Sequence, residues 1–356
     1  MKTRFTLLFS LWLTLVLVLA SCEREDPLLG PYQTSLELNT PDYFPEPEIP
    51  GDNELTQLRA DLGKRLFFDP VLSIDSTISC ASCHKPELAF TDGRAVSLGV
   101  DNRTGVRNSP PVFNLAFMED FFWDGGSPTL ELQAIVPIEH PDEMAFSLPE
   151  MEQRIQQRED YVELFRKAYN EAPTADGVLR AVSAYQRSLV SYESPYDRYL
   201  QGDDNALTPS QYRGMELFFG ERAECFHCHN GVLFTDQGFH NNGLYADYED
   251  QGRFLVTSDP RDEGKFKVPT LRNIELTAPY MHDGSLEDLE SVVEHYMSGG
   301  KRHPNQSPLV RRFGLNEQEK QDLVNFMKAL TDQKFIDRHR NDEATAQQVW
   351  AEWSSR

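Results

Sequence analysis

Two copies of one short motif constrain this chain more than any other feature of its sequence. The motif is C-x-x-C-H, and its residues are Cys80, Cys83, His84, Cys225, Cys228 and His229. Such a motif binds haem c covalently through its cysteines and supplies the histidine as proximal iron ligand. Disulfides and zinc sites are the alternatives, but cysteines two residues apart make poor structural staples, and zinc sites seldom end twice in C-x-x-C-H. The sequence therefore predicts two covalently bound haem c groups.

The fifth cysteine, Cys22, lies near the N-terminus, and the sequence before it has the features of an export signal. Lys2 and Arg4 precede an uncharged apolar run, 5–20, that is too short to span a bilayer comfortably. The run ends in Leu-Ala-Ser-Cys, as in a bacterial lipobox, so residues 1–22 are predicted to be a lipoprotein signal in which Cys22 is lipidated. An ordinary cleaved signal with a chance cysteine is the alternative. With the lipid, the protein would be periplasmic and held at a membrane surface.

The chain is strongly acidic, with a formal net charge of −23. Such a field repels nucleic acid and favours basic partners, for example a cationic electron-donor protein. A well-solvated acidic surface without a partner role is the alternative interpretation.

A weak internal repeat organises the rest of the chain. Residues 62–84 read LGKRLFFDPVLSIDSTISCASCH, and residues 212–229 read YRGMELFFGERAECFHCH. Each copy has a predicted helix ending in Leu-Phe-Phe, a loop, the haem motif and then Phe-Thr-Asp. The second helix is expected to begin at Thr208, and a later one is capped by Asn316 with Glu319. Small c-type cytochromes have this order of elements.

The fold class is therefore predicted to be mainly α, with two cytochrome c-like domains that each enclose one covalently bound haem c. The hydrophilic stretch 194–210 is the expected boundary, and no convincing β-ladder is found. The predicted division is a Pro-rich tether at 23–50, an N-terminal domain at 51–200, a C-terminal domain at 201–340 and a charged tail at 341–356.

Two longer motifs resemble those of a known family. Residues 121–144 read FFWDGGSPTLELQAIVPIEHPDEM, and residues 266–296 read FKVPTLRNIELTAPYMHDGSLEDLESVVEHY. Both are similar to signatures of bacterial di-haem cytochrome c peroxidases and their MauG-type relatives, and the resemblance covers roughly residues 50–335. It implies an N-terminal peroxidatic haem, a C-terminal electron-transfer haem and calcium between them.

The resemblance also implies roles for residues near the first haem. Trp123 matches the tryptophan that lies between the haems, and Gln133, Pro137 and Glu143 follow it at the spacing of the family's distal pocket. Cleavage of the peroxide O–O bond requires a proton moved from the iron-bound oxygen to the leaving one, and Glu143 is the predicted carrier. A core tryptophan and a solvated surface glutamate are the alternatives.

The sixth ligand of each haem decides whether it transfers electrons or binds peroxide. Many family members block the first haem with a histidine, which falls here on Val100, so this haem is expected to be open without reductive activation. In the second domain, fourteen residues after His282, stands Tyr296, with Met297 next. Tyr296 is the predicted ligand, as in MauG, and Met297 is the alternative. A tyrosinate would lower the reduction potential, whereas a methionine would raise it.

The family's calcium ligands match Asn108, Thr277 and Pro279, the last two through backbone oxygens, which suit a hard cation. All three are otherwise ordinary turn residues. His282 is expected to lie close to the second haem.

Three functions are compatible with this sequence. The first is a cytochrome-c peroxidase that reduces hydrogen peroxide to water, with electrons from a small cytochrome c or cupredoxin entering at the C-terminal haem. The second is a MauG-like enzyme that oxidises a protein or small-molecule substrate, which Tyr296 and Val100 favour. The third is a lipid-anchored di-haem electron carrier, which has no use for Gln133 and Glu143. The sequence leaves open the donor and whether the protein is a homodimer.

Overall fold

The computed structural model describes residues 35–354, so the predicted signal, Cys22 and residues 23–34 lie outside the described part of the chain. Within it the fold is mainly helical, as predicted, and strands β1 (Phe239–His240) and β2 (Phe266–Lys267) form a small antiparallel sheet. The α-helices are α1 (Gln57–Phe68), α2 (Cys80–Cys83), α3 (Leu130–Glu139), α4 (Leu148–Gln156), α5 (Glu159–Tyr169), α6 (Ala175–Ser188), α7 (Pro195–Leu200), α8 (Pro209–Phe218), α9 (Phe254–Thr257), α10 (Leu289–Ser298), α11 (Glu317–Lys328), α12 (Gln333–His339) and α13 (Asp342–Ser354). Between residues 35 and 354, no helix has both the length and the apolar character needed to cross a membrane.

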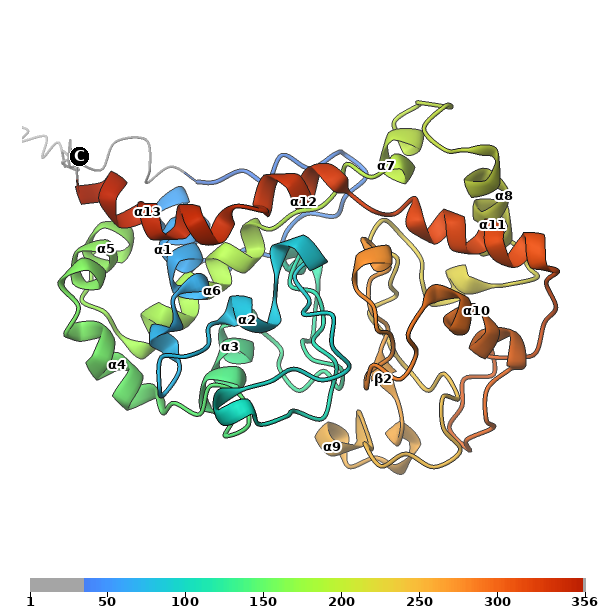
Figure 1. Cartoon of the computed structure of the whole chain (residues 1–356), viewed down its shortest axis with the longest axis horizontal. Coiled ribbons are helices and arrows are strands. Elements are labelled where there is room, and N and C mark those ends of the chain that lie inside the picture. The colour runs from blue at the N-terminus through green and yellow to red at the C-terminus, as the bar shows by residue number, and fades with distance from the viewer. Residues whose placement is uncertain (1–34, 355–356) are drawn as a thin grey trace, which may run out of the picture.

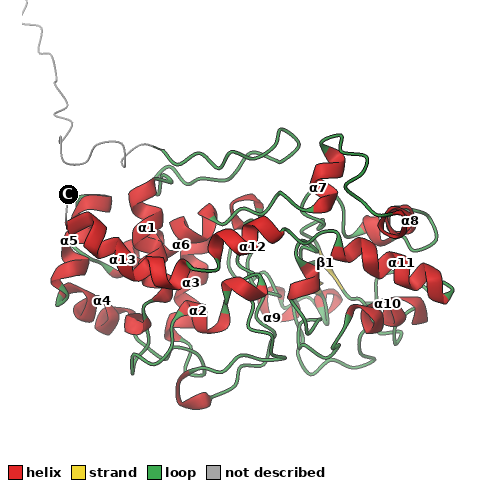
Figure 2. Cartoon of the chain, turned by 45° about the horizontal axis from the view of Figure 1, so that its top comes forward, coloured by secondary structure: helices red, strands yellow, loops and turns green. Residues whose placement is uncertain are grey.

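Two helical units lie side by side along the longest axis of the molecule (Figure 1). Helices α1 to α6 surround the apolar core of the N-terminal unit, and α8, α10 and α11 surround that of the C-terminal unit. Long loops fill much of the region between the two sets of helices (Figure 2). The two haem motifs are therefore carried by separate cores.

The internal repeat corresponds to a close helix crossing that occurs once in each unit. In the N-terminal unit α1 meets α6 at Gly63, where an added Cβ would lie 1.8 Å from the Ala181 carbonyl oxygen. In the C-terminal unit α8 meets α11 at Gly214, where an added Cβ would lie 1.9 Å from the Asp322 carbonyl oxygen. Only glycine permits these close crossings. Each glycine precedes a Leu-Phe-Phe sequence at the same spacing, so the repeat reflects a shared packing requirement.

The end of the chain returns to the N-terminal unit, in contrast to the charged tail expected at 341–356. Phe335 of α12 and Ala346 of α13 are buried in the core of that unit. Asp342 accepts a hydrogen bond from the Tyr185 hydroxyl at 2.8 Å. Figure 1 shows α12 and α13 lying over the N-terminal unit. The few apolar residues among many charged ones carry this packing, and local composition does not reveal it.

Residues 35–50, hereafter the strap, form part of the expected extended tether but lie against both units. Phe44 is buried in a small apolar cluster with Phe117 of the N-terminal unit and Leu233 of the C-terminal unit. Burial of the Phe44 ring and backbone hydrogen bonds to the N-terminal unit hold this segment in place.

A buried ion pair lies under the strap. Arg272 of the C-terminal unit donates to both carboxylate oxygens of Asp197 on α7, at 2.8 Å each, and both side chains are completely buried. Tyr43 of the strap donates its hydroxyl to Asp197 at 3.2 Å, and the Arg272 guanidinium lies 5.0 Å from the centre of the Phe44 ring. This pair therefore connects the strap to the predicted boundary segment between the units.

Candidate functional site

The two motif histidines have matching surroundings. Nδ1 of His84 lies 2.9 Å from the carbonyl oxygen of Phe90, and Nδ1 of His229 lies 3.0 Å from that of Phe234. Both phenylalanines have left-handed backbone conformations, with φ of 59° and 53°. Burial lowers the pKa of both imidazoles, which favours the neutral form. An N–H donated at Nδ1 leaves the Nε2 lone pair available to a metal, so both histidines fit an axial haem ligand.

A cavity in the C-terminal unit fits a haem c. Its walls include Cys225, Cys228 and His229 together with Tyr296 of α10, and none of the four motif cysteines forms a disulfide. Met297 does not line this cavity and packs against the apolar core of the C-terminal unit. Burial raises the pKa of Tyr296 to about 12. Of the two ligands considered from the sequence, Tyr296 is the one that the structure brings together with the haem motif.

The same cavity contains Met281, a residue that the sequence reasoning missed. Its sulfur accepts a hydrogen bond from Asn242 Nδ2 at 3.2 Å. His282, expected near the second haem, lines the cavity too, and its ring stacks on Phe266 with the centroids 3.8 Å apart. Met281 directly precedes His282 in the sequence PYMHDG, so its place near the second haem motif could have been predicted from this motif. The prediction considered only residues fourteen or fifteen positions after His282, which lie on α10.

Trp123 lies at the junction between the units. Its indole N–H donates to the carbonyl oxygen of Asn108 at 2.8 Å, and its own carbonyl oxygen accepts from the Lys267 N–H at 2.7 Å. The side chain packs against an apolar cluster of the C-terminal unit that includes Phe266, with Met281 alongside, and it lines the cavity. The structure therefore places the predicted inter-haem tryptophan between N-terminal backbone and C-terminal aromatic residues.

Charged side chains hold the loop that carries Trp123. Arg107 forms ion pairs of 2.6 Å with both Asp124, the next residue in the loop, and Asp250 of the C-terminal unit. Lys267 donates its ammonium group to two backbone carbonyl oxygens just before the tryptophan, and burial lowers its pKa to about 8. These contacts fix the loop from both sides of the junction.

The three predicted calcium ligands also line this cavity. Asn108 donates its side-chain amide to the carbonyl oxygen of Arg94 at 2.8 Å, which leaves the amide oxygen as its cation-binding atom. Thr277 and Pro279 line it from the C-terminal unit and would offer backbone oxygens to a cation. An amide oxygen and backbone oxygens are ligands that suit Ca²⁺, so the residues present fit this ion.

In the N-terminal unit, the loop that contains Gly99 and Val100 packs closely against the turn that carries Glu143. The N–H of Val100 donates to the carbonyl oxygen of Glu143 at 2.8 Å, and the Val100 side chain is buried. At Gly99 an added Cβ would lie 2.1 Å from the Asp142 carbonyl oxygen. Val100 thus contributes a backbone contact, and its side chain has no atom that binds iron.

Glu143 is near enough to the first haem motif for its charge to act on both motif cysteines. The pKa of the Cys80 thiol is raised to about 12 and that of the Cys83 thiol to about 11, chiefly by burial and with a smaller contribution from the Glu143 charge. Burial also raises the pKa of Glu143 itself. Two cysteines for attachment, a neutral histidine and a weakly acidic carboxyl group therefore occur together, and this set fits a haem c with a proton carrier.

Gln133 and Pro137 stand one turn apart on α3, which leads into the turn with Glu143. The helix begins at Thr129, whose hydroxyl accepts from the Leu132 N–H, and the Pro137 carbonyl oxygen accepts from the N–H that follows Glu143. One helix and its C-terminal turn therefore carry all three predicted distal residues.

Comparisons with known proteins identify the family to which this chain is similar. A family model described as di-haem cytochrome c peroxidase matches residues 57–205. The chain is 41% identical over 293 residues to the methylamine utilization protein MauG of Methylorubrum extorquens, covering 82% of each chain. It is 38% identical to the cytochrome c551 peroxidase of Nitrosomonas europaea, covering 76% of this chain and 79% of that one. The crystal structure of a MauG-like protein associated with microbial copper homeostasis matches with a TM-score of 0.81 and 39% identity, covering 85% of this chain and 97% of that one.

Proposed function

Because the chain belongs to the family of di-haem cytochrome c peroxidases and MauG proteins, we propose that it reduces hydrogen peroxide to water at the N-terminal haem. Electrons from a small redox protein enter at the C-terminal haem. The observation that carries this proposal is the partly buried Glu143, which is hydrogen-bonded through its backbone to Val100, a residue whose side chain has no iron-binding atom, and whose charge acts on Cys80 and Cys83.

Glu143 acts on the protons of the reaction. When bound, the haem held by Cys80, Cys83 and His84 supplies the iron at which peroxide is reduced. Glu143 takes a proton from one peroxide oxygen and delivers it to the other, which then leaves as water. Burial raises its pKa, which favours the protonated carboxyl group and so suits a group that must carry a proton. Gln133 is assigned to the same pocket as a polar neighbour.

The loop with Val100 keeps the first site accessible. Its backbone hydrogen bond to Glu143 holds the loop in place. Because the valine side chain has no iron-binding atom, the bound haem iron would stay accessible to peroxide from this side. No reductive activation is then needed before the first turnover.

Trp123 lies on the electron path between the units, and Tyr296 is the proposed sixth ligand of the C-terminal haem. A tyrosinate stabilises ferric iron and lowers the reduction potential. Calcium at Asn108, Thr277 and Pro279 would tie the two units together close to Trp123. The acidic chain favours a cationic donor, such as a small cytochrome c or cupredoxin. We place the enzyme in the periplasm, anchored through Cys22.

A second candidate function is a MauG-like oxidation of a protein or small-molecule substrate. The position of Tyr296 in the cavity wall, with Met297 packed against the apolar core instead, is the observation that favours it. In that case the two oxidising equivalents of one peroxide pass to the substrate, and no electron-donor protein is required.

Low-temperature EPR of the fully oxidised holoprotein tests the proposal, before and after one equivalent of hydrogen peroxide. We expect one high-spin and one low-spin ferric signal, with the high-spin signal changed by peroxide. Two low-spin signals that peroxide does not change would refute the proposal that the first haem is open to peroxide. Glu143→Gln should bind both haems normally and lose peroxide turnover; unchanged turnover would exclude the proton-carrier role.

A further inference from the structure

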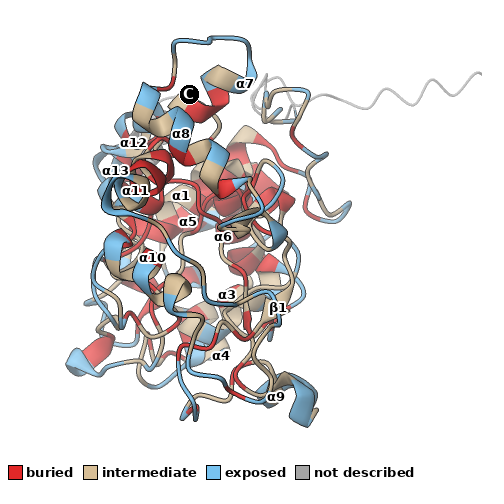
Figure 3. Cartoon of the chain, turned by 90° about the vertical axis from the view of Figure 1, so that its right-hand side faces the viewer, coloured by how far each residue is buried: buried red, intermediate tan, exposed pale blue. Residues whose placement is uncertain are grey.

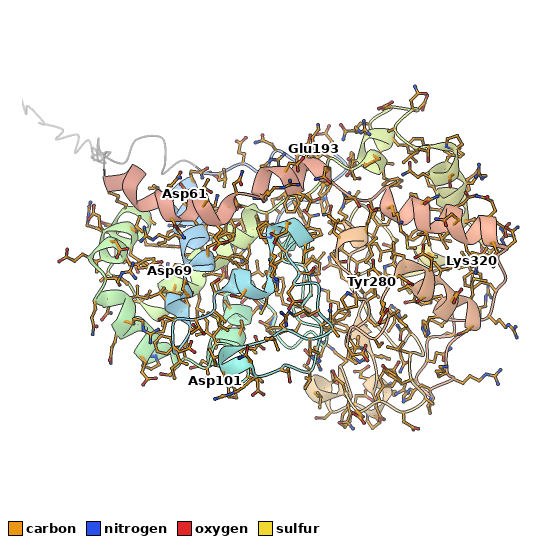
Figure 4. The ribbon with its side chains drawn as sticks, in the orientation of Figure 1. Asp61, Asp69, Asp101, Glu193, Tyr280 and Lys320 are labelled. Carbon is orange, nitrogen blue, oxygen red and sulfur yellow. The ribbon has the colours of Figure 1, made fainter. Side chains whose placement is uncertain are left out.

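An aromatic and acidic surface element adjoins the C-terminal cavity, and the proposed function gives it no role. It consists of the loop 245–250, with sequence YADYED, and the turn between Tyr280 and Leu286 that carries Asp283. Tyr280 is labelled in Figure 4. Tyr245 is exposed to solvent, whereas Tyr248 is buried.

Aromatic rings connect the cavity wall to this surface. His282 and Phe266 line the cavity, and Tyr248 contacts both, with ring centroids 6.1 Å and 6.0 Å away. The Tyr248 ring in turn meets the Tyr245 ring edge-on at 5.5 Å. Trp123 packs against the apolar cluster that contains Tyr248 and Phe266. Side chains in contact therefore run without a break from the inter-haem tryptophan to solvent.

Tyr245 has a proton acceptor in place. Its hydroxyl donates a 2.6 Å hydrogen bond to Asp283 Oδ2. Burial acts to raise the pKa of Asp283, but hydrogen bonds from Tyr245 and Ser285 outweigh it and lower this pKa, so the carboxylate is ionised. A phenol loses an electron more readily when its proton moves at the same time to a base, because the radical cation is avoided.

The charge around Tyr245 indicates which donors reach it. Asp247 and Glu249 on the same loop are exposed, as is Glu287 beyond Asp283. Lys301 brings one positive charge to this region, because its backbone N–H donates to the Gly243 carbonyl oxygen. The carboxylates outnumber it, so the local charge is net negative. A surface of this sign attracts cations and repels anions.

We propose that Tyr245 is a surface oxidation site at which a cationic one-electron donor delivers electrons to the enzyme. This inference rests on the proposed peroxide chemistry, which supplies the oxidising equivalents. An electron leaves the Tyr245 phenol through Tyr248 and the cavity-wall aromatics, and the phenolic proton moves to Asp283. The donor returns one electron and Asp283 returns the proton. Two such cycles supply the two electrons that, with two protons, convert one hydrogen peroxide into two water molecules.

Freeze-quench EPR of the holoprotein mixed with hydrogen peroxide, without donor, tests the inference. Wild type should show a radical whose spectrum narrows when tyrosine is ring-deuterated, and Tyr245→Phe should lose most of this signal. Tyr212→Phe is the matched control, because Tyr212 is also exposed but lies on α8, where its ring contacts Tyr199. A radical that persists in Tyr245→Phe, or a peroxide-responsive wild type without a tyrosyl radical, would overturn the inference and leave the proposed function standing. If peroxide changes neither haem signal, both the inference and the proposed function are overturned.

Donor kinetics give a second readout. With a trimethylammonium-substituted ferrocene as cationic donor, Tyr245→Phe should lower the oxidation rate at least about tenfold. The wild-type rate should also fall steeply with salt, whereas ferrocyanide, an anionic donor, should react slowly throughout. Asp283→Asn should slow the cationic donor and leave the peroxide-induced change at the first haem intact. Equal rates for wild type and Tyr245→Phe would show that electrons enter elsewhere.

Discussion

The buried Asp197–Arg272 pair allows a stability prediction with a stated magnitude. Asp197→Asn keeps the side-chain shape but leaves the Arg272 guanidinium completely buried without a counter-charge. Removing one partner of a buried pair costs about 3–5 kcal/mol, because the remaining charge is desolvated and uncompensated. Since Asp197 also accepts from Ser194 and from Tyr43 of the strap, we place the cost at the upper end of this range.

Urea unfolding of the holoprotein measures this cost. For a denaturant slope of about 3 kcal/mol per molar, the midpoint should fall by about 1 M or more at an unchanged slope. Asp101→Asn is the control, because Asp101 and Arg103 form an exposed pair at 3.0 Å, and Figure 4 shows Asp101 at the edge of the N-terminal unit. Exposed pairs contribute about 0–1 kcal/mol. A shift for Asp197→Asn no larger than that of the control would refute the reasoning.

The same pair gives a pH signature. Burial acts to raise the pKa of Asp197, but the hydrogen bonds and charge of Arg272 outweigh it and lower this pKa. A carboxyl group with a lowered folded-state pKa contributes stability that is complete above its unfolded pKa, about 4, and lost as pH falls through the folded value. Wild type should therefore lose more stability than Asp197→Asn when unfolding is repeated between about pH 5 and pH 3. Parallel curves would show that the carboxylate of Asp197 is not stabilised by folding.

Three further outcomes are expected. Gly214→Ala should lower the thermal midpoint by several degrees, because the added Cβ would overlap a backbone oxygen of α11. Gly314→Ala is the control and should leave the midpoint unchanged, since nothing lies within 4 Å of its added Cβ. Equal midpoints for the two variants would contradict the close crossing. Tyr296→Phe should convert the second haem from low-spin to high-spin in EPR, and Met297→Leu should not; the reverse result would identify the methionine as ligand. Removal of calcium with EGTA should slow peroxide turnover until Ca²⁺ is returned, and an enzyme that tolerates EGTA with no bound calcium by elemental analysis would exclude the ion.

Local patterns predicted much of the fold. The cap at Thr208 and the capping box of Asn316 with Glu319 begin α8 and α11 where expected. The haem motifs and the sequences that follow them predicted two matching units, and the matching contacts of His84 and His229 agree with this. These features could be predicted because each depends on residues close together in the sequence.

Contacts between distant residues could not be predicted in this way. Phe335 and Ala346 complete a core whose other members lie mostly before residue 190, and Phe44 is buried only because two units meet around it. The backbone bond from Val100 to Glu143 and the place of Met281 in the cavity also depend on tertiary geometry. Figure 3 shows how exposed and buried residues alternate along the loops of the C-terminal side without the regular period of a helix or strand.

The return of α12 and α13 has a consequence for how the molecule matures. Core residues of the C-terminal unit fall between 196 and 330, whereas the N-terminal core draws on both ends of the described chain. The second unit is thus an insertion within the first. During synthesis from the N-terminus onward, the cysteines of the first motif emerge early, yet their own unit acquires its last core residues only after the second unit has emerged. The N-terminal unit can therefore complete its core only after residues 335–346 have been made, and a chain cut near residue 200 would lack part of that core.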